Sequence, residues 1–358
     1  MSKINRRNFL KLSAIGLGGL TASQILAACS QLLSPATPSA PPAATPAPVS
    51  SPTQIPSTGA NTAALPGATD TVPAPTQAPP STQTPMSIPD MAVARGGQQP
   101  EALVRSAIAA LGGMERFVSK GASVIIKPNI CVAYHPYQYA ATTNPWVVAG
   151  LVKMCLEAGA GKVQVMDNPF GGTEDECYAS TGIKAQVEAA GGQMAYMPLF
   201  KYTTVPIPNG VAMKQINLFG DILTADVVIN VPIAKTHDLA GLTLGMKNLM
   251  GIVRDRPAMH GNINQKLADL TSLVRPKLTV VDAVRILVAN GPTGGSLSDV
   301  KELDTVIASP DIVAADSYAT TLFGMHPEDL PCIPAAVAMG LGRSDLNNMK
   351  IEEIPVGG

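Results

Sequence analysis

The sequence predicts an α/β domain with a Rossmann-like, mainly parallel sheet that carries helices on both faces. Two observations predict this fold class. Short apolar strands alternate with helical segments along the chain after residue 90. The strands are nearly continuous apolar runs, which is typical of parallel strands buried on both faces. A signal peptide and a disordered, proline-rich linker are predicted to precede the domain.

Residues 1–29 have the pattern of an export signal. Arg6 and Arg7 lead into a moderately apolar run over 14–26, which is typical of a signal for the twin-arginine (Tat) translocase. The run ends in Leu-Ala-Ala-Cys, which resembles a lipobox whose Cys29 thiol accepts a diacylglycerol. The alternative is an uncleaved membrane helix over 9–28, but several polar side chains interrupt that stretch. We expect a protein anchored to the membrane by lipid on Cys29, with its domain on the extracytoplasmic side of the cell envelope.

Residues 30–90 are predicted to form a disordered tether. Pro, Ala, Thr and Ser dominate this segment, and only Asp70 and Asp90 are charged after residue 33. Such a composition buries too little apolar surface to offset the entropy of ordering the chain. The globular α/β domain is then expected over 91–358.

Local signals position the elements of that domain. Gly112 and Gly159 stop the first two helices, Asn209-Gly210 predicts a hairpin with a type I′ turn, and Ser309 is placed to cap the last helix. The expected order is helix 100–111, strand 122–127, helix 145–158, strand 162–167, helix 183–190, strand 194–198, strand 226–231, helix 264–274, strand 278–282, strand 306–308 and helix 310–323.

Composition and motifs exclude several classes of function. The 358-residue chain has a formal net charge of −1 and 4% aromatic residues, so it gives no sign of nucleic-acid binding. It has neither a Gly-x-Gly-x-x-Gly fingerprint nor a Walker A loop. The cysteines beyond Cys29 are widely spaced without a Cys-x-x-Cys pair, so no Cys-ligated iron–sulfur cluster is expected. Their disulfide pairing stays open, and Cys131 and Cys155 fit buried apolar positions.

Polar residues gather where the predicted strands end. Because the carboxyl ends of parallel strands meet at one edge of a sheet, these side chains are expected to converge there. The strand-end residues are Lys127, Asn129, Asp167, Lys235, His237 and Asp282, and Lys247 and Asn248 follow in the next segment.

The lysines and asparagines suit an anionic ligand. Lys127, Lys235 and Lys247 would supply positive charge, with Arg254 nearby in sequence. Asn129 and Asn248 would act as neutral donors that orient the ligand. The alternative for each lysine taken singly is a solvated surface charge. The set together indicates a site for a small carboxylate or phosphate compound.

Two histidines are candidates for proton transfer. Histidine as a residue type titrates near neutral pH, which makes His237 and His260 candidates, and Asp167, Asp282 or Asp316 could orient them. Asp282 and Asp316 could instead combine with the histidines in a divalent-metal site. A structural, hydrogen-bonded imidazole is the alternative at each position.

Several strings together resemble the family known as domain of unknown function 362. They are Ile126-Lys127-Pro128-Asn129, the run over 230–237, the run over 244–251, His260, Val281-Asp282-Ala283, Gly291-Pro292, Ser309-Pro310-Asp311 and Ala315-Asp316. The resemblance implies an α/β fold over nearly the whole domain. Many members of that family also carry ferredoxin-like cysteine clusters, and the resemblance implies their electron-transfer role only for chains with such clusters, which this chain lacks.

Two functions stay open at this stage. The first is an enzyme that acts on a small anionic substrate through His/Asp acid–base or metal-assisted chemistry. The second is a non-catalytic lipoprotein that binds a small anion or a metal complex. Contact between His237 and Asp167 or Asp316 would favour the enzyme.

Overall fold

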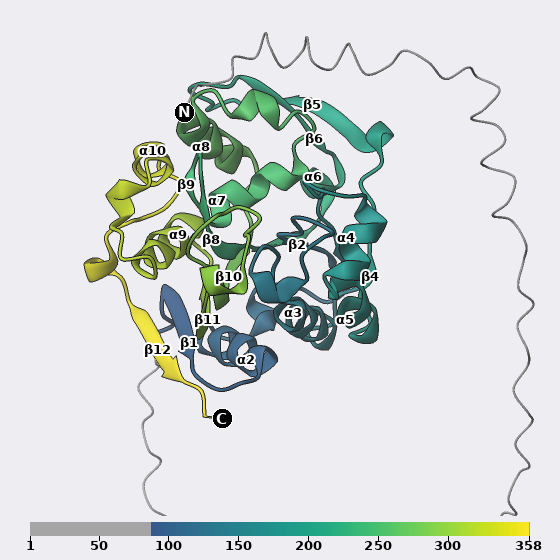
Figure 1. The fold of residues 1–358 in the computed structure, drawn as a ribbon, viewed down its shortest axis with the longest axis vertical. Coiled ribbons are helices and arrows are strands. Elements are labelled where there is room, and N and C mark those ends of the chain that lie inside the picture. The colour runs from purple at the N-terminus through teal and green to yellow at the C-terminus, as the bar shows by residue number, and fades with distance from the viewer. Residues whose placement is uncertain (1–86, 358) are drawn as a thin grey trace, which may run out of the picture. The chain divides into compact units, whose positions relative to one another are not determined.

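The computed structural model describes residues 87–357, so the predicted signal, its Arg6, Arg7 and Cys29, and nearly all of the linker lie outside the described residues. A ten-stranded sheet forms the centre of the described part (Figure 1). Its strands are β1 (Met91–Arg95), β2 (Ser123–Pro128), β3 (Lys162–Val165), β4 (Gln193–Met194), β7 (Val227–Val231), β8 (Ile233–His237), β9 (Gly241–Thr243), β10 (Leu278–Leu287), β11 (Val300–Ser309) and β12 (Ile351–Pro355).

The sheet is mixed but mostly parallel. Its order is β12-β1-β11-β10-β7-β2-β3-β4, with β8 beside β10 and β9 beside β8. Parallel pairing joins β2 to β3 and β7, β3 to β4, β10 to β7 and β8, and β1 to β12. Strand β11 runs antiparallel to β1 and β10, and β9 runs antiparallel to β8. The predicted α/β fold class is confirmed.

Helices cover both faces of the sheet (Figure 1). Successive side chains of a strand point to opposite faces, and in β2 Val124 and Ile126 belong to one core whereas Ile125 belongs to the other. The first core includes α2 (Pro100–Ala110), α3 (Pro145–Glu157), α4 (Glu174–Ser180) and α5 (Ile183–Ala189). The second includes α6 (Asp221–Thr224), α7 (Gly245–Asn248), α8 (Ile263–Leu273), α9 (Ile312–Thr321) and α10 (Cys332–Ala338).

The strand order reverses between β2 and β7. From β2 the chain adds β3 and β4 outward on one side, and β7 then pairs with the other side of β2. Such a reversal leaves a crevice at the carboxyl ends of the strands, where open α/β sheets bind ligands. In residues 87–357, no helix combines the length and apolarity needed to cross a bilayer.

Two local predictions are wrong in detail. A hairpin forms between β5 (Tyr202–Pro206) and β6 (Gln215–Phe219), but neither Asn209 nor Gly210 has the positive φ of a type I′ turn. The longer connection is instead held by the buried Asp269 carboxylate, which accepts the backbone N–H groups of residues 211–213 at 2.7–2.8 Å. Helix α9 is capped by Asp311 rather than Ser309, because the Asp311 carboxylate accepts the first free N–H groups of the helix.

Several predicted strand lengths are also wrong. Strands β10 and β11 each run for ten residues and pair antiparallel, whereas short strands were expected there. Strand β4 has two residues, and β1 and β12 were not predicted. Strands β1 and β12 pair with each other, so each depends on a partner far away in the chain.

Candidate functional site

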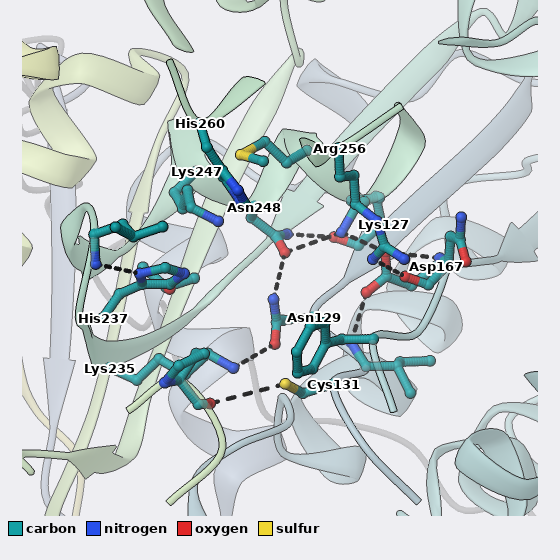
Figure 2. A pocket seen from close by; sticks show the side chains of 18 of the residues that line it. Lys127, Asn129, Cys131, Asp167, Lys235, His237, Lys247, Asn248, Arg256 and His260 are labelled. Atoms are coloured by element: carbon teal, nitrogen blue, oxygen red, sulfur yellow. Dashed lines mark hydrogen bonds and ion pairs between the residues drawn. The ribbon is translucent and has the colours of Figure 1, made fainter. Parts of the chain in front are cut away.

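A pocket of about 510 Å³ lies at the carboxyl ends of β2 and β3 and beside β8 and α7 (Figure 2). It occupies the place where the strand order reverses. Eight of the residues predicted from the sequence line it: Lys127, Asn129, Asp167, Lys235, His237, Lys247, Asn248 and His260. Their chemical roles stay predictions, and their geometry separates them into distinct groups.

Lys127 and Asp167 form a buried ion pair in the wall of the pocket. The Lys127 Nζ lies 2.7 Å from Asp167 Oδ1, and the two side chains are 1% and 3% exposed. The ammonium also donates to Pro128 O at 2.8 Å and Asn248 Oδ1 at 3.0 Å, so its three hydrogens are all engaged. Asp167 accepts from the Ile130 N–H at 2.7 Å through its other oxygen. Burial lowers the pKa of Lys127, and Asp167 opposes that effect. The pair forms part of the pocket wall, and Lys127 has no hydrogen-bond donor left for a ligand.

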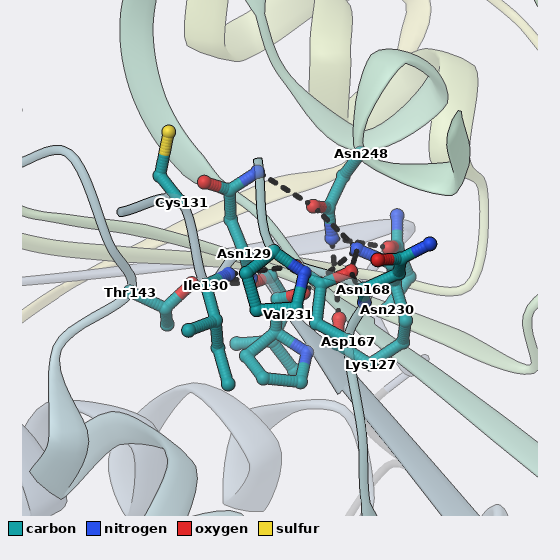
Figure 3. A network of polar contacts seen from close by, with 12 residues as sticks. Lys127, Asn129, Ile130, Cys131, Thr143, Asp167, Asn168, Asn230, Val231 and Asn248 are labelled. Carbon is teal, nitrogen blue, oxygen red and sulfur yellow. Dashed lines mark hydrogen bonds and ion pairs between the residues drawn. The ribbon is translucent and has the colours of Figure 1, made fainter. Parts of the chain in front are cut away.

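Two asparagines link this ion pair to Lys235 (Figure 2). Figure 3 shows the part of this network that runs from Lys127 through Asn248 to Asn129. Asn248 Oδ1 accepts from Lys127 Nζ and from Asn129 Nδ2, both at 3.0 Å. Asn129 Oδ1 in turn accepts from Lys235 Nζ at 2.9 Å. The amide of Asn248 is fixed by a further bond from its Nδ2 to Asn230 Oδ1 at 2.9 Å. This network orients both amides and places Lys127 and Lys235 at its two ends.

Lys235 lies on β8 and is 1% exposed. Its Nζ donates to Ala141 O at 2.6 Å and to Asn129 Oδ1 at 2.9 Å, so two of its three hydrogens have protein acceptors. Burial lowers the pKa of Lys235, and the Cys131 sulfur beside it opposes that effect. Among the described residues, the third hydrogen of this buried amine has only the weakly accepting Cys131 sulfur beside it, so it can be donated to a ligand in the pocket.

Lys247, in α7, has a different environment from the other two lysines. Among residues 87–357 its Nζ has no hydrogen bond and no ion pair, although the side chain is half-buried. Burial, followed by the positive charge of Lys235, lowers the pKa of Lys247 to about 8. Its amine is therefore partly deprotonated near neutral pH.

His237 is a neutral hydrogen-bond donor. Its Nδ1 accepts from the backbone N–H groups of Leu239 at 3.1 Å and Ala240 at 3.4 Å, so the ring proton resides on Nε2. Burial and the charge of Lys247 lower the pKa of His237 to about 4. A neutral imidazole of this kind can polarise a carbonyl oxygen. Asp167 is committed to Lys127, so the expected support of His237 by that carboxylate is not what the structure shows.

His260 lies at the edge of the pocket and is exposed. It follows the short 3-10 helix over Pro257–Met259. Burial lowers the pKa of His237 most, and the proximity of His260 contributes least to that shift. The structure therefore places His260 at the entrance and His237 deeper in the pocket.

Asp282 and Asp316 do not line the pocket, and we do not retain them as metal candidates. Both are fully buried. Asp282 accepts from the Asn144 N–H at 2.6 Å, and Asp316 accepts from the Gly245 N–H at 2.6 Å, so each carboxylate anchors a backbone turn. Among the described residues, no group of three or more His, Cys, Asp or Glu side chains could hold a metal ion.

The pocket lining also includes Arg256, Cys131 and Thr243, which were not among the predicted site residues. Arg256, rather than Arg254, reaches the pocket, where its guanidinium donates to Asn168 O and Pro169 O, both at 3.0 Å. Cys131, which is 6% exposed, lines the pocket beside Lys235. Thr243 is 3% exposed, and its Oγ1 has no hydrogen-bond partner among the described residues.

The fold and the pocket define an α/β protein with a basic site at the reversal of its strand order. The sequence pattern of the family described as "Domain of unknown function (DUF362)" matches residues 124–321. The chain belongs to this family. The match includes the pocket residues and leaves β1, α2 and β12 outside it.

Known proteins with detectable similarity include one curated relative and two solved structures. A thylakoid-associated protein of Synechocystis sp. is 28% identical over 258 residues, which cover 67% of this chain and 75% of that protein. A Thermotoga maritima protein of known structure aligns with a TM-score of 0.39 and 12% identity over 64% of this chain and 60% of that one. The lactate racemase apoprotein from Thermoanaerobacterium thermosaccharolyticum aligns with a TM-score of 0.36 and 13% identity over 60% and 53%. This chain thus spans less than two thirds of each solved structure, and these two similarities say nothing about its function.

Proposed function

We propose that this protein binds a small anion with a carboxylate or phosphate group in the pocket beside β8 and α7. The observation that supports this most is the unpaired positive charge of Lys247, together with the free donor of Lys235. Asp167 compensates Lys127 only, and Asp238, the other acid at the pocket, is exposed. The excess positive charge disfavours a cation and attracts an anion.

Binding is tested by calorimetry with inorganic phosphate and with pyruvate, which separate the two kinds of anion. Lys247→Gln should weaken binding of the recognised anion about tenfold or more, since a charge-assisted hydrogen bond contributes about 1.5–3 kcal/mol. Lys162→Gln is a matched control, because Lys162 is exposed and starts β3 at the end of the strand away from the pocket. No binding of either anion by the wild-type protein would refute the proposal.

We further propose that the protein is exported by the Tat translocase and anchored by lipid on Cys29, with its domain on the extracytoplasmic side of the cell envelope. The paired Arg6 and Arg7 and the lipobox-like ending support this. The similarity to a thylakoid-associated protein also supports membrane association.

The location is tested by fractionating cells that express the full chain. Cys29→Ala should move the exported protein from the membrane to the soluble fraction. Replacing Arg6 and Arg7 by lysines should block export. If the Cys29→Ala protein stays with the membrane, the lipid anchor is wrong.

The non-catalytic binder and the enzyme use the same pocket. The half-buried His237 has no carboxylate partner among residues 87–357, so the geometry does not support a His/Asp acid–base pair at that position. The properties of Lys247 favour an enzyme of a different kind.

A further inference from the structure

We propose that Lys247 is a nucleophile that captures the carbonyl carbon of a small anionic aldehyde or 2-oxo acid as an imine. This inference rests on the proposed anion-binding function and adds a substrate class and a covalent step to it. It follows from differences among the three lysines of one pocket, and from the groups that surround the amine of Lys247.

The three lysines differ in what holds their protons. Lys127 has three acceptors, one of them the Asp167 carboxylate, and Lys235 has two. Lys247 has none among residues 87–357, and it lies half-buried at the same pocket as these two cations. Desolvation and neighbouring positive charge are the two conditions that turn a lysine into a neutral nucleophile. Lys247 meets both, and its lowered pKa agrees with this.

The neighbouring donors are arranged on one face of the β8–β9 pair. Lys235 and Thr243 are register partners across these strands, so their side chains lie next to each other. His237 is two residues after Lys235 on β8 and therefore points to the same face. All three line the pocket, as Lys247 does.

These donors match the parts of a carbonyl-containing anion. Lys235 has one hydrogen that faces only the weakly accepting Cys131 sulfur, and the buried Thr243 hydroxyl has no partner among residues 87–357, so both can bind the carboxylate or phosphate group. His237 presents a neutral Nε2–H, which can donate a hydrogen bond to the carbonyl oxygen. A buried hydroxyl without a partner is unfavourable in the empty pocket, so a ligand that pairs with Thr243 is favoured.

The covalent step is balanced without an oxidant or a reductant. The neutral amine of Lys247 attacks the carbonyl carbon, and a C–N bond forms as the C–O π bond breaks. The nitrogen gives up one proton and the oxygen gains one, which gives a carbinolamine. Loss of that hydroxyl with a proton as water leaves the imine. One amine and one carbonyl thus become one imine and one water molecule.

The test uses the mature full chain, purified in detergent, at pH 8 with cyanoborohydride. The probes are glyoxylate, an aldehyde that carries a carboxylate, and pyridoxal phosphate, an aldehyde that carries a phosphate. Intact mass and peptide mapping should show one reduced adduct per chain, located on Lys247. The probe that reacts identifies which anionic group the pocket prefers.

Lys247→Arg keeps the positive charge but cannot form an imine, so it should lose the adduct. Lys162→Arg should keep it, because Lys162 is exposed and lies away from the pocket. Equal labelling of Lys247→Arg and wild type, label scattered over surface lysines, or no label from either probe would overturn the inference. Calorimetry with phosphate and pyruvate separates the two proposals: binding without an adduct rejects only the imine, whereas no binding rejects the proposed function.

Discussion

Gly251 lies directly against the Lys127–Asp167 ion pair. A Cβ atom at position 251 would fall 2.0 Å from Asp167 Oδ1 and 2.6 Å from Lys127 Nζ. Neither atom can move away easily, because both side chains are buried and fully hydrogen-bonded. The pocket therefore needs a residue without a side chain at this position.

Gly251→Ala should lower the free energy of unfolding by about 3 kcal/mol, a value within the range for overpacking and for a disturbed buried ion pair. Urea unfolding measures this change. Gly261→Ala is the matched control, since a Cβ atom at position 261 would meet nothing within 4 Å. If the two variants are equally stable, the Lys127 and Asp167 side chains can move to make room for a Cβ atom at position 251, and the prediction is wrong.

Anion binding should weaken as the pH rises through about 8. Lys247 loses its proton in that range because burial and Lys235 lower its pKa to about 8. Sulfate is the suitable probe, because its own charge is constant there. The dissociation constant of wild-type protein for sulfate should rise between pH 7 and 9, whereas that of Lys247→Arg should stay flat. A parallel rise in both proteins would assign the titration to another group.

Much of the site could be predicted because polar residues follow the parallel strands. Lys127 and Asp167 end or follow β2 and β3, and such ends meet at one edge whatever the details of packing. The same rule failed for Asp282, because β10 continues to Leu287 and Asp282 lies within the strand, where it accepts the Asn144 N–H. Sequence position does not say whether a carboxylate faces a cavity or a backbone turn.

The positions of Thr243 and Arg256 at the pocket depend on contacts between residues that are far apart in the chain. Thr243 reaches the pocket only because β9 turns back along β8, and that antiparallel pair carries no separate signal in the sequence. Arg256 and Arg254 are alike in sequence, yet Arg256 donates to the loop after β3 and Arg254 lies over the Tyr202 ring. The fold class was predictable from local periodicity, but the choice between neighbouring residues came from packing.

Cys131 should be the cysteine that reacts with iodoacetate. It lines the basic pocket, whereas Cys155, Cys177 and Cys332 are buried in the two cores. Burial also raises the pKa of Cys155 to about 12 and that of Cys177 to about 11, so their reactive thiolates are rare. Peptide mapping after brief alkylation should find the label on Cys131, and phosphate or pyruvate should slow it.

Neutral iodoacetamide provides the comparison for that experiment. The positive charge of the pocket should favour the anionic reagent at Cys131, and added salt should reduce the preference. Labelling of the four thiols to the same extent would mean that Cys131 is not accessible from the pocket.

Asp316 should make the protein less stable as the pH rises from about 4 to about 7. Burial raises the pKa of this carboxyl from 3.8 to about 7, despite the backbone N–H groups of Met246 and Gly245 that bind it. Between these values the folded state keeps the proton and the unfolded state releases it, so the free energy of unfolding falls by about 1.4 kcal/mol per pH unit. Asp316→Asn mimics the neutral acid and should remove this contribution, whereas Asp255→Asn, at an exposed carboxylate, should not. The measurement is the difference in unfolding free energy between wild type and Asp316→Asn at several pH values. A difference that stays constant from pH 4 to 7 would contradict the prediction. It would mean that the Asp316 carboxyl is ionised throughout this range, because its two backbone hydrogen bonds outweigh its burial.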